Sequence, residues 1–175
     1  MDKLSPSAKQ SLFIYSCEYG QLDFVKELLC DKSNINISAN NDKAFRLACK
    51  NNFMITNLII NKGANNFNEG LLVACKYDNN HIAQLLIEKG ANNLNEGLLI
   101  ACKFNRISIV YLLINKGADN LNEGFKIACQ YDNPRIVKFM IKKGVKILNE
   151  GIKIAQEYGN DRIKKYLKQL IVDNE

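Results

Sequence analysis

The chain has 175 residues, of which 47% are hydrophobic and 24% charged, and a formal net charge of +6. With ten glycines, two prolines and no linker rich in Gly, Ser or Pro, this composition excludes disordered and collagen-like chains and favours one folded domain. No apolar run approaches the roughly 18 residues of a membrane-spanning helix, and Met1 to Ser7 lack the pattern of an export signal. We therefore expect an intracellular, cytoplasmic protein without a membrane span.

The sequence repeats itself. Asn-Glu-Gly recurs at a constant step of 27 residues, and the segments beginning at Asn68 and Asn95 match at 17 of 27 positions. Weaker markers continue upstream at Ala48-Cys49 and Ser16-Cys17, so we count six units. Their approximate limits are 1–41, 42–67, 68–94, 95–121, 122–148 and 149–175, and together they form a single repeat domain, 1–175.

Each unit predicts two short helices. In unit 95–121, Asn95 is a suitable N-cap, and Glu96 places a carboxylate in the positively polarised first turn. Asn105 predicts a turn, and Lys116-Gly117 is a typical end for the second helix. The turn position is held by residue types that tolerate a left-handed backbone: Gly20, Asn52, Asp78, Asn105, Asp132 and Gly159.

Two helices of this length cannot bury a core alone, so neighbouring pairs must stack into one continuous core. The last unit has the features of a cap. Gln156 stands where earlier units have cysteine, and the final helix alternates apolar residues such as Ile163 and Leu167 with lysines.

The segment from Ala74 to Ala91 resembles the ankyrin repeat, and the resemblance extends over essentially the whole chain. The period of 27 is shorter than the family's 33, and the Thr-Pro-Leu-His motif is absent. Between Gly63 and Ala74 there is too little chain for a β-turn finger, whereas Ser33 to Ser38 leave room for one. The resemblance implies an all-α, ankyrin-like α-solenoid of helix-turn-helix repeats with shortened or missing β-turn fingers.

The resemblance also implies a function: a monomeric, non-catalytic scaffold that binds another protein through the concave surface of its first helices. Short-period repeats rich in Asn, Ile and Lys are similar to those of giant viruses of amoebae, although AT-rich genomes of other origin give the same bias. A viral source would place the protein in the host cell cytoplasm.

The cysteines invite a metal or disulfide interpretation, but five of the six occupy one repeat position and none forms a Cys-x-x-Cys pair. Stacked helices lie about 8–10 Å apart, whereas a disulfide needs Cα atoms within about 7 Å. We expect buried thiols in a reducing compartment at Cys17, Cys49, Cys75, Cys102 and Cys129. Cys30 lies outside this register and is the candidate for reactivity.

No catalytic or metal-binding motif is present. His81 is the only histidine, and the matching positions hold Ser108 and Arg135, which indicates a surface position without fixed chemistry. The recurring carboxylates are interpreted as partners of the helix dipole: Glu69, Glu96, Glu123 and Glu150. We therefore expect neither an enzyme nor a cofactor or metal.

The solvent-facing side of the first helices is basic with two apolar residues. Residues one and five positions after the core-facing Leu71, Leu98, Phe125 and Ile152 share a second face. The candidate partner-binding residues on it are Arg46, Lys50, Leu72, Lys76, Leu99, Lys103, Lys126 and Lys153. They predict a groove for an acidic segment with apolar anchors. The alternative is that the lysines only maintain solubility and the leucines are hydrophobic staples.

Positive charge is concentrated near the C-terminus. Residues 125–175 contain eleven Lys/Arg and six Asp/Glu, a balance of +5, which leaves +1 for residues 1–124. Non-specific nucleic-acid binding is the alternative function, through Lys142, Lys143, Lys146, Lys164, Lys165 and Lys168. These charges are scattered over both helices without interleaved aromatic residues for base stacking, so a solvated basic cap is favoured over nucleic acid or a membrane surface.

Overall fold

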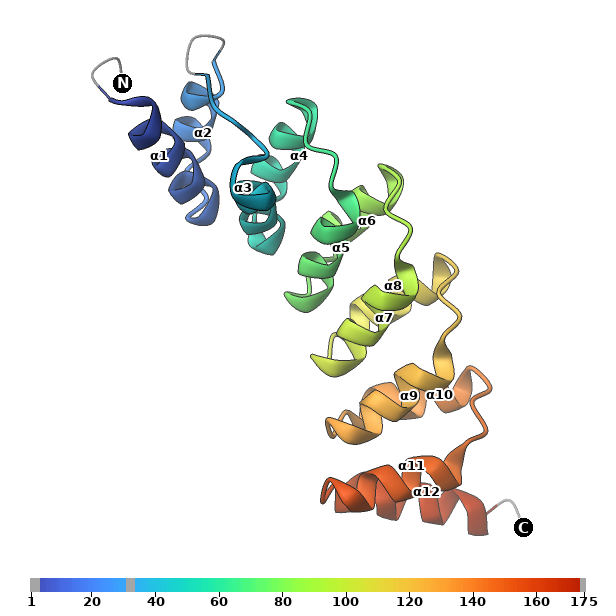
Figure 1. Ribbon diagram of the computed structural model, residues 1–175. Coiled ribbons are helices and arrows are strands. Elements are labelled where there is room, and N and C mark those ends of the chain that lie inside the picture. The colour runs from blue at the N-terminus through green and yellow to red at the C-terminus, as the bar shows by residue number, and fades with distance from the viewer. Residues whose placement is uncertain (1–3, 31–33, 174–175) are drawn as a thin grey trace. The chain divides into compact units, whose positions relative to one another are not determined.

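The computed structural model describes residues 4–30 and 34–173 of the chain. The chain forms two compact units, Met1–Asn92 and Asn93–Glu175. Every regular element of the described residues is an α-helix, which confirms the predicted all-α class (Figure 1). The expectation of one repeat domain over residues 1–175 remains a prediction.

The first unit contains three helix pairs within its described residues. Their helices are α1 (Pro6–Glu18), α2 (Leu22–Leu28), α3 (Ala39–Asn51), α4 (Phe53–Asn61), α5 (Phe67–Lys76) and α6 (Asn80–Glu88). The first helices α1, α3 and α5 pack side by side, and α2, α4 and α6 form a second row. Contacts are more extensive in the first row than in the second.

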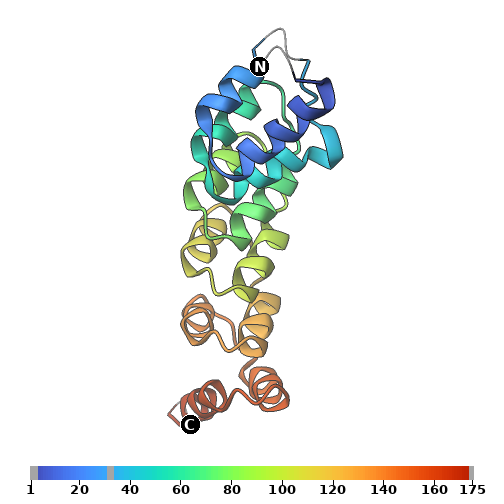
Figure 2. The same cartoon turned by 90° about the vertical axis from the view of Figure 1, so that its left-hand side faces the viewer.

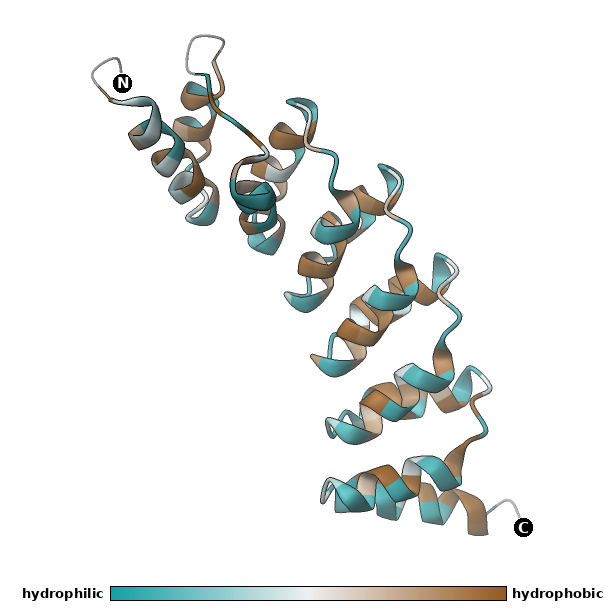
Figure 3. Ribbon diagram, viewed as in Figure 1, coloured by the Kyte–Doolittle hydropathy of each residue, from teal (hydrophilic) through white to brown (hydrophobic). Residues whose placement is uncertain are grey.

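The second unit repeats this arrangement. Its helices are α7 (Leu94–Lys103), α8 (Ile107–Asn115), α9 (Leu121–Gln130), α10 (Pro134–Lys142), α11 (Leu148–Glu157) and α12 (Asp161–Val172). Helices α7, α9 and α11 form the closely packed row, and α8, α10 and α12 the looser one; Figure 2 separates the two rows at α9 to α12. Hydrophobic and hydrophilic stretches alternate along the helices (Figure 3).

Glycine in the Asn-Glu-Gly motif is explained by close helix packing. A Cβ atom on Gly70 would lie 2.8 Å from Cε1 of Phe45 and 3.1 Å from Sγ of Cys49, on the preceding first helix. At Gly151 it would lie 2.7 Å from the ring of Phe125. Only glycine allows the first helices to approach this closely, so close packing explains the glycine of the motif.

The predicted N-cap at Asn95 is wrong. Helix α7 begins one residue earlier, at Leu94, and Asn95 lies in its first turn. Its side-chain oxygen accepts hydrogen bonds from the backbone N–H groups of Asp119 at 2.9 Å and Asn120 at 3.2 Å. The side-chain oxygen of Asn68 likewise accepts a hydrogen bond from the backbone N–H of Asn92 at 2.9 Å. The asparagine therefore recurs because it fixes the loop of the following repeat.

The predicted turn positions are largely confirmed. Asp78, Asn105 and Asp132 have φ values of 64°, 57° and 53°, in the left-handed region. Asn52 is the exception, with a φ of −125°. It caps α4 instead, because its side-chain oxygen accepts a hydrogen bond from the N–H of Ile55 at 2.9 Å.

Hydrogen bonds from buried or half-buried asparagines join successive repeats. The Nδ2 atom of Asn133 donates to the carbonyl of Cys102 at 2.7 Å, and Asn160 donates to the carbonyl of Cys129 at 2.7 Å. In the first unit, Asn79 donates to the carbonyl of Lys50 at 2.8 Å. Each bond satisfies a carbonyl at the end of a first helix, where the helix itself supplies no donor.

The segment expected to form a fuller finger is a loop. Ser33 lies outside the described residues, and residues 34–36 have no regular structure. The backbone of Asn36 is held by Gln10 on α1, with both bonds at 2.9 Å. Within the described residues 34–38, this segment therefore contacts the first helix without forming a strand.

Candidate partner-binding surface

In the first unit, the candidate residues lie on two helices that pack against each other. Arg46 and Lys50 are on α3, and Leu72 and Lys76 are on α5. Lys76 is exposed, whereas the other three are half-buried. The structure therefore places three basic residues on the two helices that carry this partly covered leucine.

In the second unit, Leu99 and Lys103 lie on α7, Lys126 on α9 and Lys153 on α11. Lys103 and Lys153 are exposed, and Leu99 is half-buried. The combined apolar patch of Leu72 and Leu99 remains a prediction. Each leucine keeps part of its surface accessible on its own unit.

Lys126 forms an ion pair within the second unit. Its Nζ lies 2.9 Å from Oε2 of Glu150, on the neighbouring first helix. The hydrogen bond to Glu150 and then its negative charge raise the pKa of Lys126. Glu150 is in the first turn of α11, as the dipole interpretation predicted, and it also joins α11 to α9.

Sequence reasoning missed the aromatic residues beside these lysines. Nζ of Lys50 lies 5.0 Å from the ring centroid of Tyr77 in the next repeat. In the second unit, Nζ of Lys103 lies 5.8 Å from the ring centroid of Phe104 and 5.3 Å from that of Tyr131. These are cation–π distances. The lysines of these contacts lie outside residues 125–175, to which the expectation of basic charges without interleaved aromatic residues applied, so that expectation remains a prediction.

The signal for this feature was present in the repeat. An aromatic residue follows the last position of each later first helix: Tyr77, Phe104, Tyr131 and Tyr158. All four side chains are exposed. Their period of 27 places them next to the lysines of the same or the preceding helix. Helical periodicity alone does not reveal the pairing, because each ring belongs to the turn that follows the helix.

The repeated cysteines are buried, as predicted. Burial raises the pKa of Cys17, Cys49, Cys75, Cys102 and Cys129 to about 12. At neutral pH these thiols are protonated and are neither nucleophiles nor metal ligands. Cys30 is exposed, and its thiol contacts the carbonyl of Lys26 at 3.5 Å.

Other features of the described residues offer little for catalysis. His81 is exposed, and no group of three His, Cys, Asp or Glu residues is placed to hold a metal within residues 4–30 and 34–173. A hollow of about 270 Å³ lies between two loops of the second unit, with Asp119 and Lys143 in its lining. None of the helices in the described part of the chain is long and apolar enough to cross a membrane.

Comparisons with known proteins agree with this architecture. A family model described as ankyrin repeats (3 copies) matches residues 45–124 and 71–151, which together cover more than half of the chain. The fold is similar to the crystal structure of the human ASB11 ankyrin repeat domain, at 18% sequence identity and a TM-score of 0.76, over 90% of this chain and 82% of that one. No curated protein matches the sequence significantly. Ankyrin repeats generally serve as protein–protein interaction scaffolds and are typically non-catalytic. The chain is a member of the ankyrin repeat family.

Proposed function

We propose that the chain is a non-catalytic scaffold that binds another protein through one surface of its first helices. We call this the first-helix surface, and its members are Arg46, Lys50, Leu72, Lys76, Leu99, Lys103, Lys126 and Lys153. The observation that carries the proposal is that, in each unit, long basic side chains stand beside a half-buried leucine on packed neighbouring helices. Such a surface offers charge for an acidic segment and apolar area for its side chains.

Packing within each unit supports this choice of face. The first helices pack more extensively on one another than the second helices do, and glycine at the contact makes this close approach possible. In a stack of helix pairs, the more closely spaced row forms the inner side of the curve. An inner surface can contact a partner from several repeats at once.

Preorganisation also favours binding. The bonds of Asn68 and Asn95 fix the loops, and the bonds of Asn133 and Asn160 fix the ends of the first helices. A surface that is already ordered loses little conformational entropy when a partner binds. Within the first-helix surface of the second unit, the exposed Lys103 and Lys153 are the main candidates for contacts with acidic side chains, because Lys126 already pairs with Glu150.

We further propose that the chain acts as a monomer inside the cell. The five buried cysteines are reduced in the structure, and their repeat positions do not pair them with one another. Reduced thiols are stable in a reducing compartment.

Replacing both leucines tests the first-helix surface. The double variant Leu72→Asp with Leu99→Asp is expected to lose a protein partner that the unchanged chain captures and mass spectrometry identifies. A matched control places the same change at half-buried positions of the second helices, Leu85→Asp with Leu112→Asp. Helical circular dichroism must be retained in both variants. Equal capture by both would contradict the proposal.

Non-specific nucleic-acid binding is a second candidate, favoured by the contacts of Lys103 with Phe104 and Tyr131. Exposed rings beside cations are the features on which single-stranded nucleic acid stacks. Binding should then fall steeply with salt and depend on Lys142, Lys143, Lys146, Lys164, Lys165 and Lys168. A gel shift with single-stranded DNA that is negative at low salt removes this candidate.

A further inference from the structure

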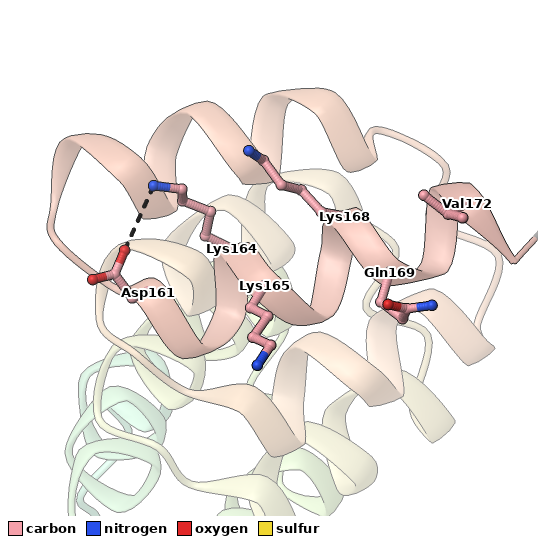
Figure 4. A pocket seen from close by; sticks show the side chains of 6 residues that line it. All are labelled: Asp161, Lys164, Lys165, Lys168, Gln169 and Val172. Atoms are coloured by element: carbon pink, nitrogen blue, oxygen red, sulfur yellow. Dashed lines mark ion pairs between the residues drawn. The ribbon is translucent and has the colours of Figure 1, made fainter.

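The surface of α12 carries a hollow that lies outside the first-helix surface. Its volume is about 360 Å³, and most of its lining is apolar. The lining residues are Asp161, Lys164, Lys165, Lys168, Gln169 and Val172, all on α12. Figure 4 shows Lys164 and Lys168 extending to one side of the helix and Lys165 to the other.

A comparison of α12 with α10, the second helix of the preceding repeat, shows which positions of a second helix are normally covered. Ile136 and Met140 of α10 correspond to Ile163 and Leu167 of α12, and all four are buried. These positions therefore belong to the hydrophobic core in both repeats.

Two other positions are buried in the repeat of α10 but not in the repeat of α12. Val137 on α10 is 0% exposed and Val145 in the loop after α10 is 5% exposed, whereas the corresponding Lys164 is half-buried and Val172 is 65% exposed. In the repeat of α10 these positions are covered, and α12 is the second helix that packs beside α10. The hollow of α12 therefore lies on the face with which a second helix receives the next repeat.

Charge distinguishes this face from its predecessors. Lys164 replaces the buried Val110 and Val137, and Lys168 replaces Ile114 and Ile141. With Lys165, three ammonium groups surround the hollow, against one carboxylate from Asp161, which lies 3.6 Å from Nζ of Lys164. The methylene stems of the lysines and the side chain of Val172 supply apolar area between the charges.

We propose that this face of α12, the α12 docking face, binds an amphipathic helix of another protein that carries acidic residues beside its apolar ones. A helix is the shape that the equivalent face of α10 accepts. Carboxylates on the helix complement the three lysines, and its apolar side chains cover the lysine stems and Val172.

Two other occupants fit the face less well. A further apolar repeat, or an apolar face of a second copy, would bury Lys168 without a counter-charge, which is costly. Single-stranded nucleic acid uses aromatic rings for base stacking, and no aromatic residue lines the hollow. The α12 docking face shares no residue with the first-helix surface, so the two proposals can fail independently.

The test uses the full chain and a fluorescent peptide of about 15 residues, with leucines at helical spacing and glutamates beside them. Fluorescence anisotropy should detect binding, and Lys165→Glu with Lys168→Glu should weaken it at least about tenfold. The matched control is Lys116→Glu with Lys146→Glu, which changes the same net charge at exposed loop positions and should alter the affinity by less than about twofold. The variant Leu72→Asp with Leu99→Asp should bind the peptide normally. Circular dichroism checks the fold of every variant.

Several results would overturn the proposal. These are absence of peptide binding, equal losses in the two charge-reversal variants, or equally tight binding of a peptide with glutamine in place of glutamate. Displacement of the peptide by single-stranded DNA through Lys165 and Lys168 would assign the face to nucleic acid. Sedimentation showing a dimer that Lys165→Glu with Lys168→Glu dissociates would assign it to a second copy.

Discussion

The two units of the chain differ in regularity. In the second unit, the repeat marker recurs at Ala101, Ala128 and Ala155, always 27 residues apart. In the first unit, the corresponding Ser16, Ala48 and Ala74 are separated by 32 and 26 residues. The spacing between repeat markers is therefore constant in the second unit and variable in the first.

The bonds between repeats also differ between the two units. Both junctions of the second unit carry the same bond, from Asn133 and from Asn160, at 2.7 Å in each case. In the second repeat of the first unit, this position is held by Phe53, which cannot donate such a bond and is exposed. There the connecting loop is held by Gln10 instead. The longest step, 32 residues, is therefore found at the junction where Phe53 replaces the asparagine, and the junctions with an asparagine bond have steps of 26 or 27 residues.

The largest expected effect is on the pH dependence of the free energy of unfolding, and it comes from the thiols that share one repeat position. The pKa of each is raised from 9.0 to about 12 by burial, so the unfolded chain loses these protons at lower pH than the folded chain. The stabilisation is complete below about pH 9 and is lost as the pH rises toward 12, by about 1.4 kcal/mol per thiol and pH unit. Urea unfolding at several pH values should show this decline.

Variants sharpen the test of the thiols. Cys102→Ala with Cys129→Ala should make the decline shallower, because fewer buried thiols ionise on unfolding. A slope that is the same in this variant and in the unchanged chain would contradict the assignment.

A second prediction concerns the close helix contact of the second unit. Gly151→Ala should destabilise the fold by about 1–3 kcal/mol, although alanine is the better helix former, because the new Cβ would lie 2.7 Å from the ring of Phe125. Thermal unfolding measured by circular dichroism gives the loss. Combining it with Phe125→Leu should cost less than the sum of the two single changes, and strict additivity would argue against the contact.

A third prediction compares the junctions of the two units. Asn133→Ala leaves the carbonyl of Cys102 without this donor and should cost about 1–3 kcal/mol, because Asn133 is only 4% exposed. Asn79→Ala, at the half-buried junction of the first unit, should cost less. Urea unfolding ranks the two variants. A larger loss at Asn79 would contradict this ranking.

The outcome for single residues shows how far the sequence could predict this structure. The helix pairs, the buried cysteines and the turn at Asn105 follow from local patterns, because spacing and residue type alone determine them. The role of Asn95 could not be predicted in this way. Its bonding partner, Asp119, is 24 residues away, and a nearby helix start offered a simpler local explanation.

The candidate surface was predictable to a similar extent. Its positions on the first helices follow from helical periodicity, and the structure places Lys103 and Lys153 at exposed positions. The ion pair of Lys126 with Glu150 and the contact of Lys103 with Tyr131 depend on the distance between neighbouring helices. That distance is set by the buried glycines, whose packing role appears only in three dimensions.

The smallest expected effect compares two lysines at the same repeat position. Lys126 pairs with Glu150, whereas Lys153 has no ion-pair partner among the described residues. Lys126→Met should lower the melting temperature slightly at neutral pH and low salt, and Lys153→Met should not, because only the first removes an attraction.

The raised pKa of Lys126 means that the contribution of this ion pair to stability is present below its ordinary value of 10.5 and is lost as the pH rises through the raised value. High salt should also abolish the difference between the two variants, because both charges of the pair are accessible to solvent. A difference that persists in high salt would show that the Lys126 stem, rather than its charge, stabilises the contact between α9 and α11.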